Sequence, residues 1–127
     1  METGLKGRAE TVVVHENTAA AVGSGALEVF ATPMMIALME KAALESVQPF
    51  LEPGQGTVGI RLDVSHIAAT PTGMTVTAES ELTAIEGRTL SFRVTAHAGG
   101  ELIGEGSHLR CIVQSDRFMA KALAKAR

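Results

Sequence analysis

The spacing of apolar residues changes partway along the chain. Residues 30–50, FATPMMIALMEKAALESVQPF, repeat their apolar positions every three or four residues, which is typical of an α-helix. Residues 57–113 alternate apolar and polar positions, which is typical of β-strands that bury one face. The order of the two patterns predicts a long helix followed by an antiparallel sheet.

The helix is predicted to begin at Thr32 and Pro33, because a threonine hydroxyl can cap a helix and proline has no amide hydrogen to lose in the first turn. It runs from Pro33 to near Val47, and the segment EPGQG at 52–56 ends it. Its predicted core-facing stripe consists of Ile36, Glu40, Ala43, Val47 and Phe50. The carboxylate of Glu40 therefore lies on or beside the buried face.

Five segments are predicted to form strands. The first is TVVVH at 11–15, which is rich in β-branched residues. Three of the four that follow the helix show clear alternation, and their predicted inward residues are Val58, Ile60, Leu62, Val64 and His66, then Met74, Val76, Ala78 and Leu82, then Leu90, Phe92, Val94 and Ala96. His66 thus shares a face with four aliphatic residues.

Glycines mark the connections between the strands. EGR at 86–88 and AGGE at 98–101 predict hairpin turns. Gly104 and Gly106 predict a bulge or a close backbone approach in the last strand, which spans 101–113.

The two remaining segments complete the expected architecture. Residues 16–30 have no clear period and are expected to form a loop or short helical turns, and SDRFMAKALAKAR at 115–127 predicts a short basic helix capped by Ser115 or Asp116. One long helix across a curved antiparallel sheet of about five strands is an α+β fold. We expect a single domain spanning residues 1–127.

Three polar residues in this arrangement could carry chemistry. Glu40 and His66 both point toward the seam between helix and sheet, where a carboxylate needs a partner and an imidazole beside it would suit a general base. Thr32 lies at the helix start, where amide groups and the helix dipole favour a developing oxyanion. Each residue also has an ordinary interpretation: Thr32 as a helix cap, Glu40 tilted toward solvent, and His66 as a satisfied core or interface residue.

Composition narrows the possible partners. The net charge of −3 and the absence of Trp and Tyr argue against nucleic acid. No stretch predicts a membrane span or a secretory signal, and a lone Cys111 excludes an intramolecular disulfide, so a cytoplasmic protein is expected. No metal site is expected, because His15, His97 and His108 lack ligand spacing with a carboxylate or a cysteine.

The chain resembles the fluoroacetyl-CoA thioesterase family of hot-dog proteins between about Phe30 and Phe118. The resemblance rests on the segments FATPMMIALMEKA, LEPGQGTVG, VSHIAATPTGMTVT, EGRTLSFRVTAH and IGEGSHLR. It implies a hot-dog fold and hydrolysis of a short acyl-CoA thioester to free acid and CoA. It also implies a homodimer with sites at or near the subunit interface, and no cofactor beyond the CoA of the substrate.

The resemblance also implies roles for single residues. Thr32, Glu40 and His66 match the catalytic positions of the family, with eight residues from the first to the second and 26 from the second to the third. Gly59 matches a substrate-contacting glycine, and Arg110 matches a late-strand arginine that would bind CoA phosphates or a carboxylate at the dimer interface. Whether the enzyme forms a covalent acyl intermediate or directs water onto the thioester stays open.

The chain departs from the family pattern beside the site. The positions of two lid phenylalanines are Gly23 and Ala26 here, and Pro33 replaces a glycine. The acyl group is therefore left open, as is movement of residues 17–29 as a lid. Two alternatives to a thioesterase remain, namely a hot-dog acyl-CoA hydratase or dehydratase and a non-catalytic acyl-CoA-binding module.

Overall fold

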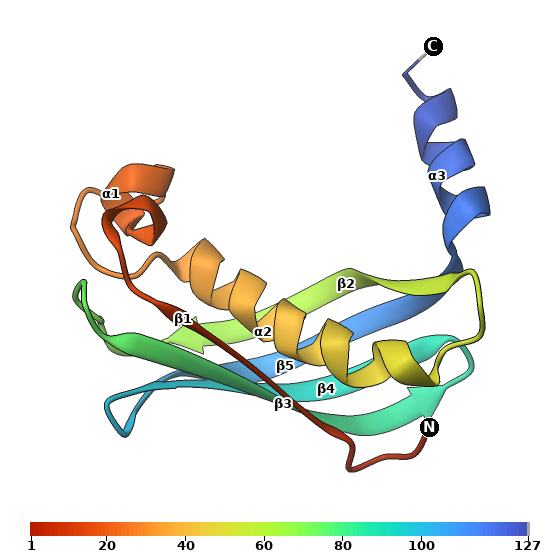
Figure 1. The fold of residues 1–127 in the computed structure, drawn as a ribbon, viewed down its shortest axis with the longest axis horizontal. Helices are drawn as coiled ribbons and strands as arrows, with labels where there is room; N and C mark the ends of the chain where they lie inside the picture. Colours follow the sequence, from red (N-terminus) through yellow and green to blue (C-terminus); the bar gives the residue numbers. More distant parts are fainter. Residues whose placement is uncertain (127) are drawn as a thin grey trace.

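A long helix lies across one face of a curled five-stranded antiparallel sheet in the computed structural model, which describes residues 1–126 (Figure 1). The elements are β1 (Lys6–Val12), the 3₁₀ helix η1 (His15–Asn17), α1 (Ala19–Val22), α2 (Thr32–Val47), the 3₁₀ helix η2 (Gln48–Phe50), β2 (Gln55–His66), β3 (Thr75–Glu86), β4 (Thr89–Ala98), β5 (Glu101–Gln114) and α3 (Ser115–Ala124). The strand order is β1-β3-β4-β5-β2, so β1 and β2 form the two edges. This is the hot-dog arrangement that the family resemblance implied.

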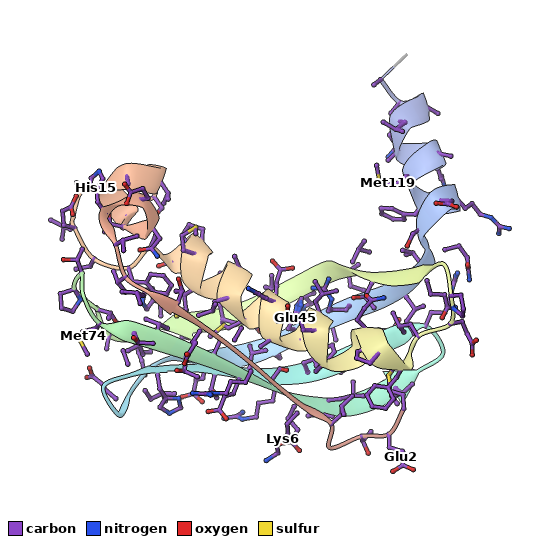
Figure 2. The ribbon with its side chains drawn as sticks, in the orientation of Figure 1. Glu2, Lys6, His15, Glu45, Met74 and Met119 are labelled. Carbon is purple, nitrogen blue, oxygen red and sulfur yellow. The ribbon has the colours of Figure 1, made fainter. Side chains whose placement is uncertain are left out.

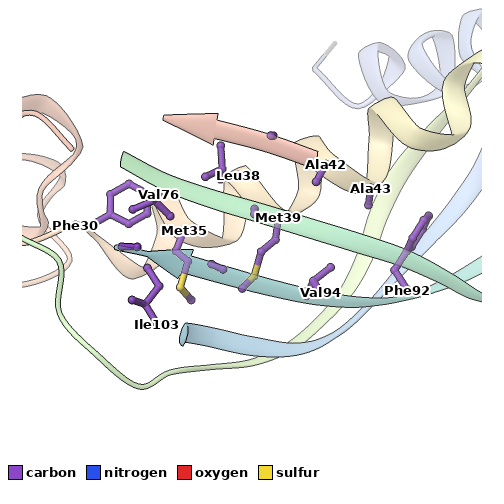
Figure 3. Close-up of a cluster of buried hydrophobic side chains, with 14 of the residues drawn as sticks. Phe30, Met35, Leu38, Met39, Ala42, Ala43, Val76, Phe92, Val94 and Ile103 are labelled. Atoms are coloured by element: carbon purple, nitrogen blue, oxygen red, sulfur yellow. The ribbon is translucent and has the colours of Figure 1, made fainter. Parts of the chain in front are cut away.

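The core lies between α2 and the concave face of the sheet (Figure 3). The predicted inward faces of β3 and β4 are confirmed, because Val76, Ala78 and Leu82 and all four predicted residues of β4 are buried. The buried side chains of α2 that meet them are Met35, Leu38, Met39, Ala42, Ala43 and Val47. The long methionines occupy the first half of this helix face and the small alanines the second half, so the second half of α2 can lie close to the strands.

The predicted stripe of α2 was partly wrong. Ala43 and Val47 are buried, but Ile36 and Glu40 are only half-buried. Phe50 is 53% exposed because α2 ends at Val47 and the chain continues as the separate helix η2. The helix rests mainly against β1 and β3, which turns its Met35 and Met39 side into the core and leaves Glu40 facing the other edge of the sheet.

The predicted face of β2 was also wrong in its first half. Gly59 pairs with Arg110 and Arg61 pairs with Leu109, so Ile60 is an extra residue at a β-bulge. A bulge reverses the alternation of side chains on either side of it. Ile60 is therefore 54% exposed, and Gly59 takes the inward position ahead of the bulge.

Two terminal predictions need correction. The first strand spans Lys6–Val12 rather than 11–15, because its bounds follow its pairing with β3 and not its β-branched residues. The cap of α3 is Gln114, with no side-chain cap hydrogen bond, rather than Ser115 or Asp116. None of the residues of α3 is buried, and the helix projects away from the sheet (Figure 1).

The predicted turns and the close approach in β5 are confirmed. The two hairpin turns hold Gly87, Gly99 and Gly100 at positive φ, which glycine adopts at little cost. Gly106 lies so close to β2 that a side-chain carbon there would collide with the carbonyl oxygen of Asp63. The short helical turns predicted for residues 16–30 are η1 and α1, although η1 begins one residue earlier, at His15. None of the helices within residues 1–126 combines the length and apolar character needed to cross a membrane.

Candidate active site

Thr32 and His66 meet at the N-terminus of α2. The Thr32 Oγ1 atom lies 2.7 Å from Nδ1 of His66, which is the last residue of β2. Thr32 is the first residue of α2, Ala31 is its N-cap, and no side chain caps the helix. The hydroxyl is therefore not used for capping, and it contacts the imidazole instead.

The environment of His66 favours a neutral imidazole. Burial lowers the pKa of His66 from its ordinary value of 6.5, and the nearby backbone of Ala68 opposes that shift. The Nε2 atom is buried and has no hydrogen-bond partner within residues 1–126. A neutral imidazole in contact with a hydroxyl can accept its proton, which is the arrangement of a base beside a nucleophile.

A pocket of about 310 Å³ opens beside this pair. Its other lining residues are mostly small or aliphatic and come from α1, from the segment before α2 and from the segment after β2. They are Ala19, Ser24, Val29, Phe30, Ile67, Ala68 and Ala69. A pocket with small and aliphatic side chains on its walls that ends at a hydroxyl and an imidazole can hold a small acyl group against both.

The segment of residues 17–30 is closed on itself and tied to the body of the protein by backbone hydrogen bonds. The amide of Ala19 donates to Val29 within the segment at 2.8 Å, and the amide of Phe30 donates to Thr70, in the loop after β2, at 2.9 Å. The two positions that carry lid phenylalanines in the family lie on this segment, and Gly23 ends α1 with a φ of 83°. Figure 2 shows His15 beside this segment, at the opposite end of the molecule from Met119 on α3.

Glu40 belongs to a second polar cluster, built around Arg110. Nη1 of Arg110 lies 3.3 Å from Oε2 of Glu40 and also donates to His108 Nε2 at 3.2 Å. Thr57 accepts twice, from Nε at its hydroxyl (2.8 Å) and from Nη2 at its carbonyl oxygen (3.0 Å). These four hydrogen bonds use nearly all the N–H groups of the guanidinium, which is only 5% exposed.

His108 orients this guanidinium. Its Nδ1 donates to the carbonyl oxygen of Arg61 at 2.8 Å, so Nε2 is the unprotonated nitrogen that accepts from Arg110. Burial lowers the pKa of His108, and the positive charge of Arg110 acts in the same direction. Burial also lowers the pKa of Arg110, while Glu40 opposes that shift. A neutral His108 can thus stay buried as an acceptor.

Gly59 lies against the same cluster. A side-chain carbon at this position would collide with Oε2 of Glu40 and would lie 3.2 Å from the ring of His108. A side chain at this position would push the carboxylate of Glu40 away from where it lies. The backbone of Gly59 and the carboxylate of Glu40 therefore lie together.

The two clusters are separate within one chain. Glu40 lies eight positions after Thr32 on α2, a rise of about 12 Å. His66 lies seven positions after Gly59 on β2, about 23 Å of strand. The expectation that Glu40 pairs with His66 in one chain was wrong, because the carboxylate pairs with Arg110 instead.

Sequence reasoning missed two members of the second cluster. Thr57 precedes Val58, the first of the residues predicted to face inward, so strict alternation put it on the outer face of β2, and the bulge was not anticipated. His108 was considered only as a metal ligand, although its spacing of two from Arg110 in a strand puts both side chains on one face. Arg110 is buried by the chain's own groups, so its geometry does not favour a phosphate ligand. No group of three or more metal-ligand side chains gathers anywhere in residues 1–126.

Comparison with known proteins identifies the family. The family model described as fluoroacetyl-CoA-specific thioesterase matches residues 13–116. The fluoroacetyl-CoA thioesterase of Streptantibioticus cattleyicolor is 49% identical over 98 residues, which cover 77% of this chain and 70% of that protein.

Solved structures agree with the sequence match. The crystal structure of the fluoroacetyl-CoA thioesterase FlK superimposes with a TM-score of 0.92 at 40% identity, covering 98% of this chain and 97% of that one. A thioesterase superfamily member from Thermus thermophilus gives a TM-score of 0.88 at 30% identity, covering 99% and 97%. A hot-dog-like protein from Thermanaerovibrio acidaminovorans shares the fold at 21% identity, with a TM-score of 0.88 and coverage of 98% and 93%. The chain therefore belongs to the family of fluoroacetyl-CoA-specific thioesterases.

Proposed function

We propose that this protein hydrolyses a short-chain acyl-CoA thioester to the free acid and CoA. The observation that carries the proposal is the 2.7 Å contact between the Thr32 hydroxyl and His66 at the mouth of an acyl-sized pocket. Membership of the thioesterase family supports the same reaction.

The contact between Thr32 and His66 supports two routes. In the first, His66 takes the hydroxyl proton while the Thr32 oxygen attacks the thioester carbon, the C–S bond breaks, and water then hydrolyses the acyl-threonine ester. In the second, His66 takes a proton from water, which attacks directly while Thr32 orients it. In both routes the thiolate of CoA leaves and gains a proton. Mass spectrometry of the quenched reaction separates them, because only the first adds the acyl mass to the chain.

The proposed enzyme is a homodimer joined along β2. β2 is an edge strand of 12 residues with an exposed Ile60. A long edge strand presents unpaired backbone N–H and C=O groups, to which a strand of a second subunit can bond. A two-fold axis that pairs β2 with its own copy runs the strands antiparallel. The His66 end of one strand then lies beside the Gly59 end of the other, which brings Glu40 of the partner subunit toward Thr32 and His66. Glu40 would position or activate the attacking group, with Arg110 holding its carboxylate.

A thiol-release assay over short, branched and aromatic acyl-CoAs, including fluoroacetyl-CoA, tests the reaction. Release of free thiol distinguishes a thioesterase from a hydratase, which leaves the thioester intact, and from a binding module, which shows no turnover. We expect His66→Ala and Thr32→Ala each to lower kcat by roughly 10² or more, the usual effect of losing a general base or an oxyanion contact. His97→Ala, on the other face of the sheet, serves as the control and should keep wild-type turnover. Wild-type rates in both site variants would exclude the proposed site.

A further inference from the structure

The ring of His108 is fixed in both its plane and its tautomer. The residue is only 1% exposed, and its ring stacks on Phe92 of β4 with the ring centres 6.0 Å apart. Its Nδ1 donates to the carbonyl oxygen of Arg61, the residue that follows the bulge at Ile60, at 2.8 Å. The ring cannot turn without losing both contacts, so the lone pair of Nε2 points in one direction.

That lone pair faces the Arg110 guanidinium. Nη1 of Arg110 carries two hydrogens, and its two acceptors are Nε2 of His108 at 3.2 Å and Oε2 of Glu40 at 3.3 Å. Thr57 accepts from the opposite edge of the guanidinium, through Nε and Nη2. Within residues 1–126, His108 is therefore the only group besides Glu40 itself that orients the Nη1 edge. Without it, a buried N–H would lack an acceptor, and the guanidinium would turn toward a new partner.

The carboxylate of Glu40 is held at one oxygen and open at the other. Oε2 accepts from Arg110, whereas no hydrogen bond within residues 1–126 involves Oε1. The side chain of Glu40 is 36% exposed and that of Arg110 is 6% exposed, so the carboxylate lies at the boundary of a buried cluster. Oε1 is thus the oxygen that can orient an attacking group or accept a proton from it.

We propose that His108 is a positioning residue for the reaction. It locks the Arg110 guanidinium, which holds Oε2 of Glu40 and leaves Oε1 as the oxygen that meets the attacking group. The proposal rests on the proposed function, in which Glu40 acts on that group. His108 itself touches neither the substrate nor the reacting atoms, because Arg110 and Glu40 lie between.

This role predicts an effect on turnover and not on substrate binding. A misplacement of a catalytic group by about 1 Å can lower the rate by about 10². The loss of an interaction that counts only in the transition state lowers kcat and leaves KM unchanged. A ring that served stability alone would change the thermal midpoint without this split.

Two substitutions of His108 separate its two hydrogen bonds. The amide of glutamine reaches the position of Nε2 and can accept from Arg110, whereas the amide of asparagine reaches the position of Nδ1 and can donate only to Arg61. Both variants lose the stacking on Phe92 and one hydrogen bond, so both should unfold at a lower temperature than the wild type. Kinetics are therefore measured well below both midpoints, with His97→Asn on the other face of the sheet as the matched control.

We expect His108→Asn to lower kcat about tenfold or more, with KM within about twofold of the wild type. His108→Gln should restore kcat to within about threefold of the wild type, since it keeps the acceptor for Arg110. His97→Asn should match the wild type. Equal kcat values for the two His108 variants would overturn the positioning role and leave the proposed function standing.

Nitrogen-15 NMR of the arginine side chains gives a readout that needs no turnover. A locked guanidinium rotates slowly and shows separate signals for its Nη hydrogens. We expect separate signals for Arg110 in the wild type and in His108→Gln, and averaged signals in His108→Asn and for the exposed Arg93. The Arg110 signals are assigned by their loss in Arg110→Met.

The two measurements distinguish failure of the proposal from failure of the proposed function. Averaged Arg110 signals in the wild type would overturn the lock, even if His108→Asn did not fold. If the wild type releases no thiol from any acyl-CoA, the proposed function fails. Separate Arg110 signals that average in His108→Asn would in that case still support the hold of His108 on Arg110.

Discussion

At the scale of single residues, two histidines of this protein are held neutral for different purposes. His66 faces a pocket and a hydroxyl, whereas His108 is only 1% exposed and accepts from Arg110. Burial lowers the pKa of both. The difference lies in their partners, because a free pocket beside His66 allows proton transfer and a closed cluster around His108 does not.

The lowered pKa of His66 predicts the acid side of the pH dependence. His66 acts as a base only when neutral, so kcat/KM should fall with acidification at a midpoint below 6.5. Stability should follow the same direction. The unfolded chain takes up protons on histidine at 6.5 more readily than the folded chain, so stability is full above that pH and is lost as pH falls further. A pH–rate profile checks the first point, and a midpoint above 6.5 would contradict it.

The Arg110 cluster predicts a large cost for removing the guanidinium. Arg110→Met keeps the length of the side chain but leaves the Thr57 hydroxyl, the His108 ring nitrogen and Glu40 without their donor. We expect a loss of about 2–4 kcal/mol in the free energy of unfolding, because buried acceptors lose their partner. Arg93→Met, which breaks an exposed ion pair with Glu105, should change it by less than about 0.5 kcal/mol in the same urea titration. Equal effects of the two variants would show that the cluster is not structural.

At the scale of elements, two glycines of β5, Gly104 and Gly106, lie so close to neighbouring groups that a side-chain carbon at either position would collide with them. A side-chain carbon at Gly106 would collide with the backbone of β2, whereas one at Gly104 would lie 2.5 Å from the sulfur at the flexible end of Met35 and 3.0 Å from the carbonyl oxygen of Ser65. Gly106→Ala should therefore destabilise the protein by about 1–3 kcal/mol, since backbone cannot move aside, and Gly104→Ala should cost less. Thermal unfolding of the two variants measures the difference. A larger loss for Gly104→Ala would contradict this account of β5.

The bulge at Ile60 is the element that decides the site. It turns Thr57 and Gly59 inward ahead of residue 60 while His66 stays inward after it. Without the extra residue at position 60, either Thr57 and Gly59 or His66 would face solvent. Both halves of β2 can therefore contribute to a site on the same side of the sheet.

At the scale of the whole molecule, the separation of Glu40 from His66 makes a heterodimer the decisive experiment. Glu40→Gln and His66→Ala subunits with different tags can be co-expressed and purified as a mixed dimer. If each site takes its acid from one subunit and its base from the other, one of the two sites is intact and activity should be about half that of the wild type. Each single-variant homodimer is the control. A mixed dimer as inactive as both controls would mean that Thr32, Glu40 and His66 act within one chain.

The sequence by itself determined the α+β class, the order of the elements, the inward faces of β3 and β4, and three candidate site residues. Those features depend on local spacing, since a helix or a strand repeats its own period wherever it packs. Only the tertiary structure decided that Thr32 contacts His66 and that Glu40 contacts Arg110 instead. These contacts depend on the bulge at Ile60 and on which side of α2 rests on the sheet, and both are set by packing between segments far apart in the chain.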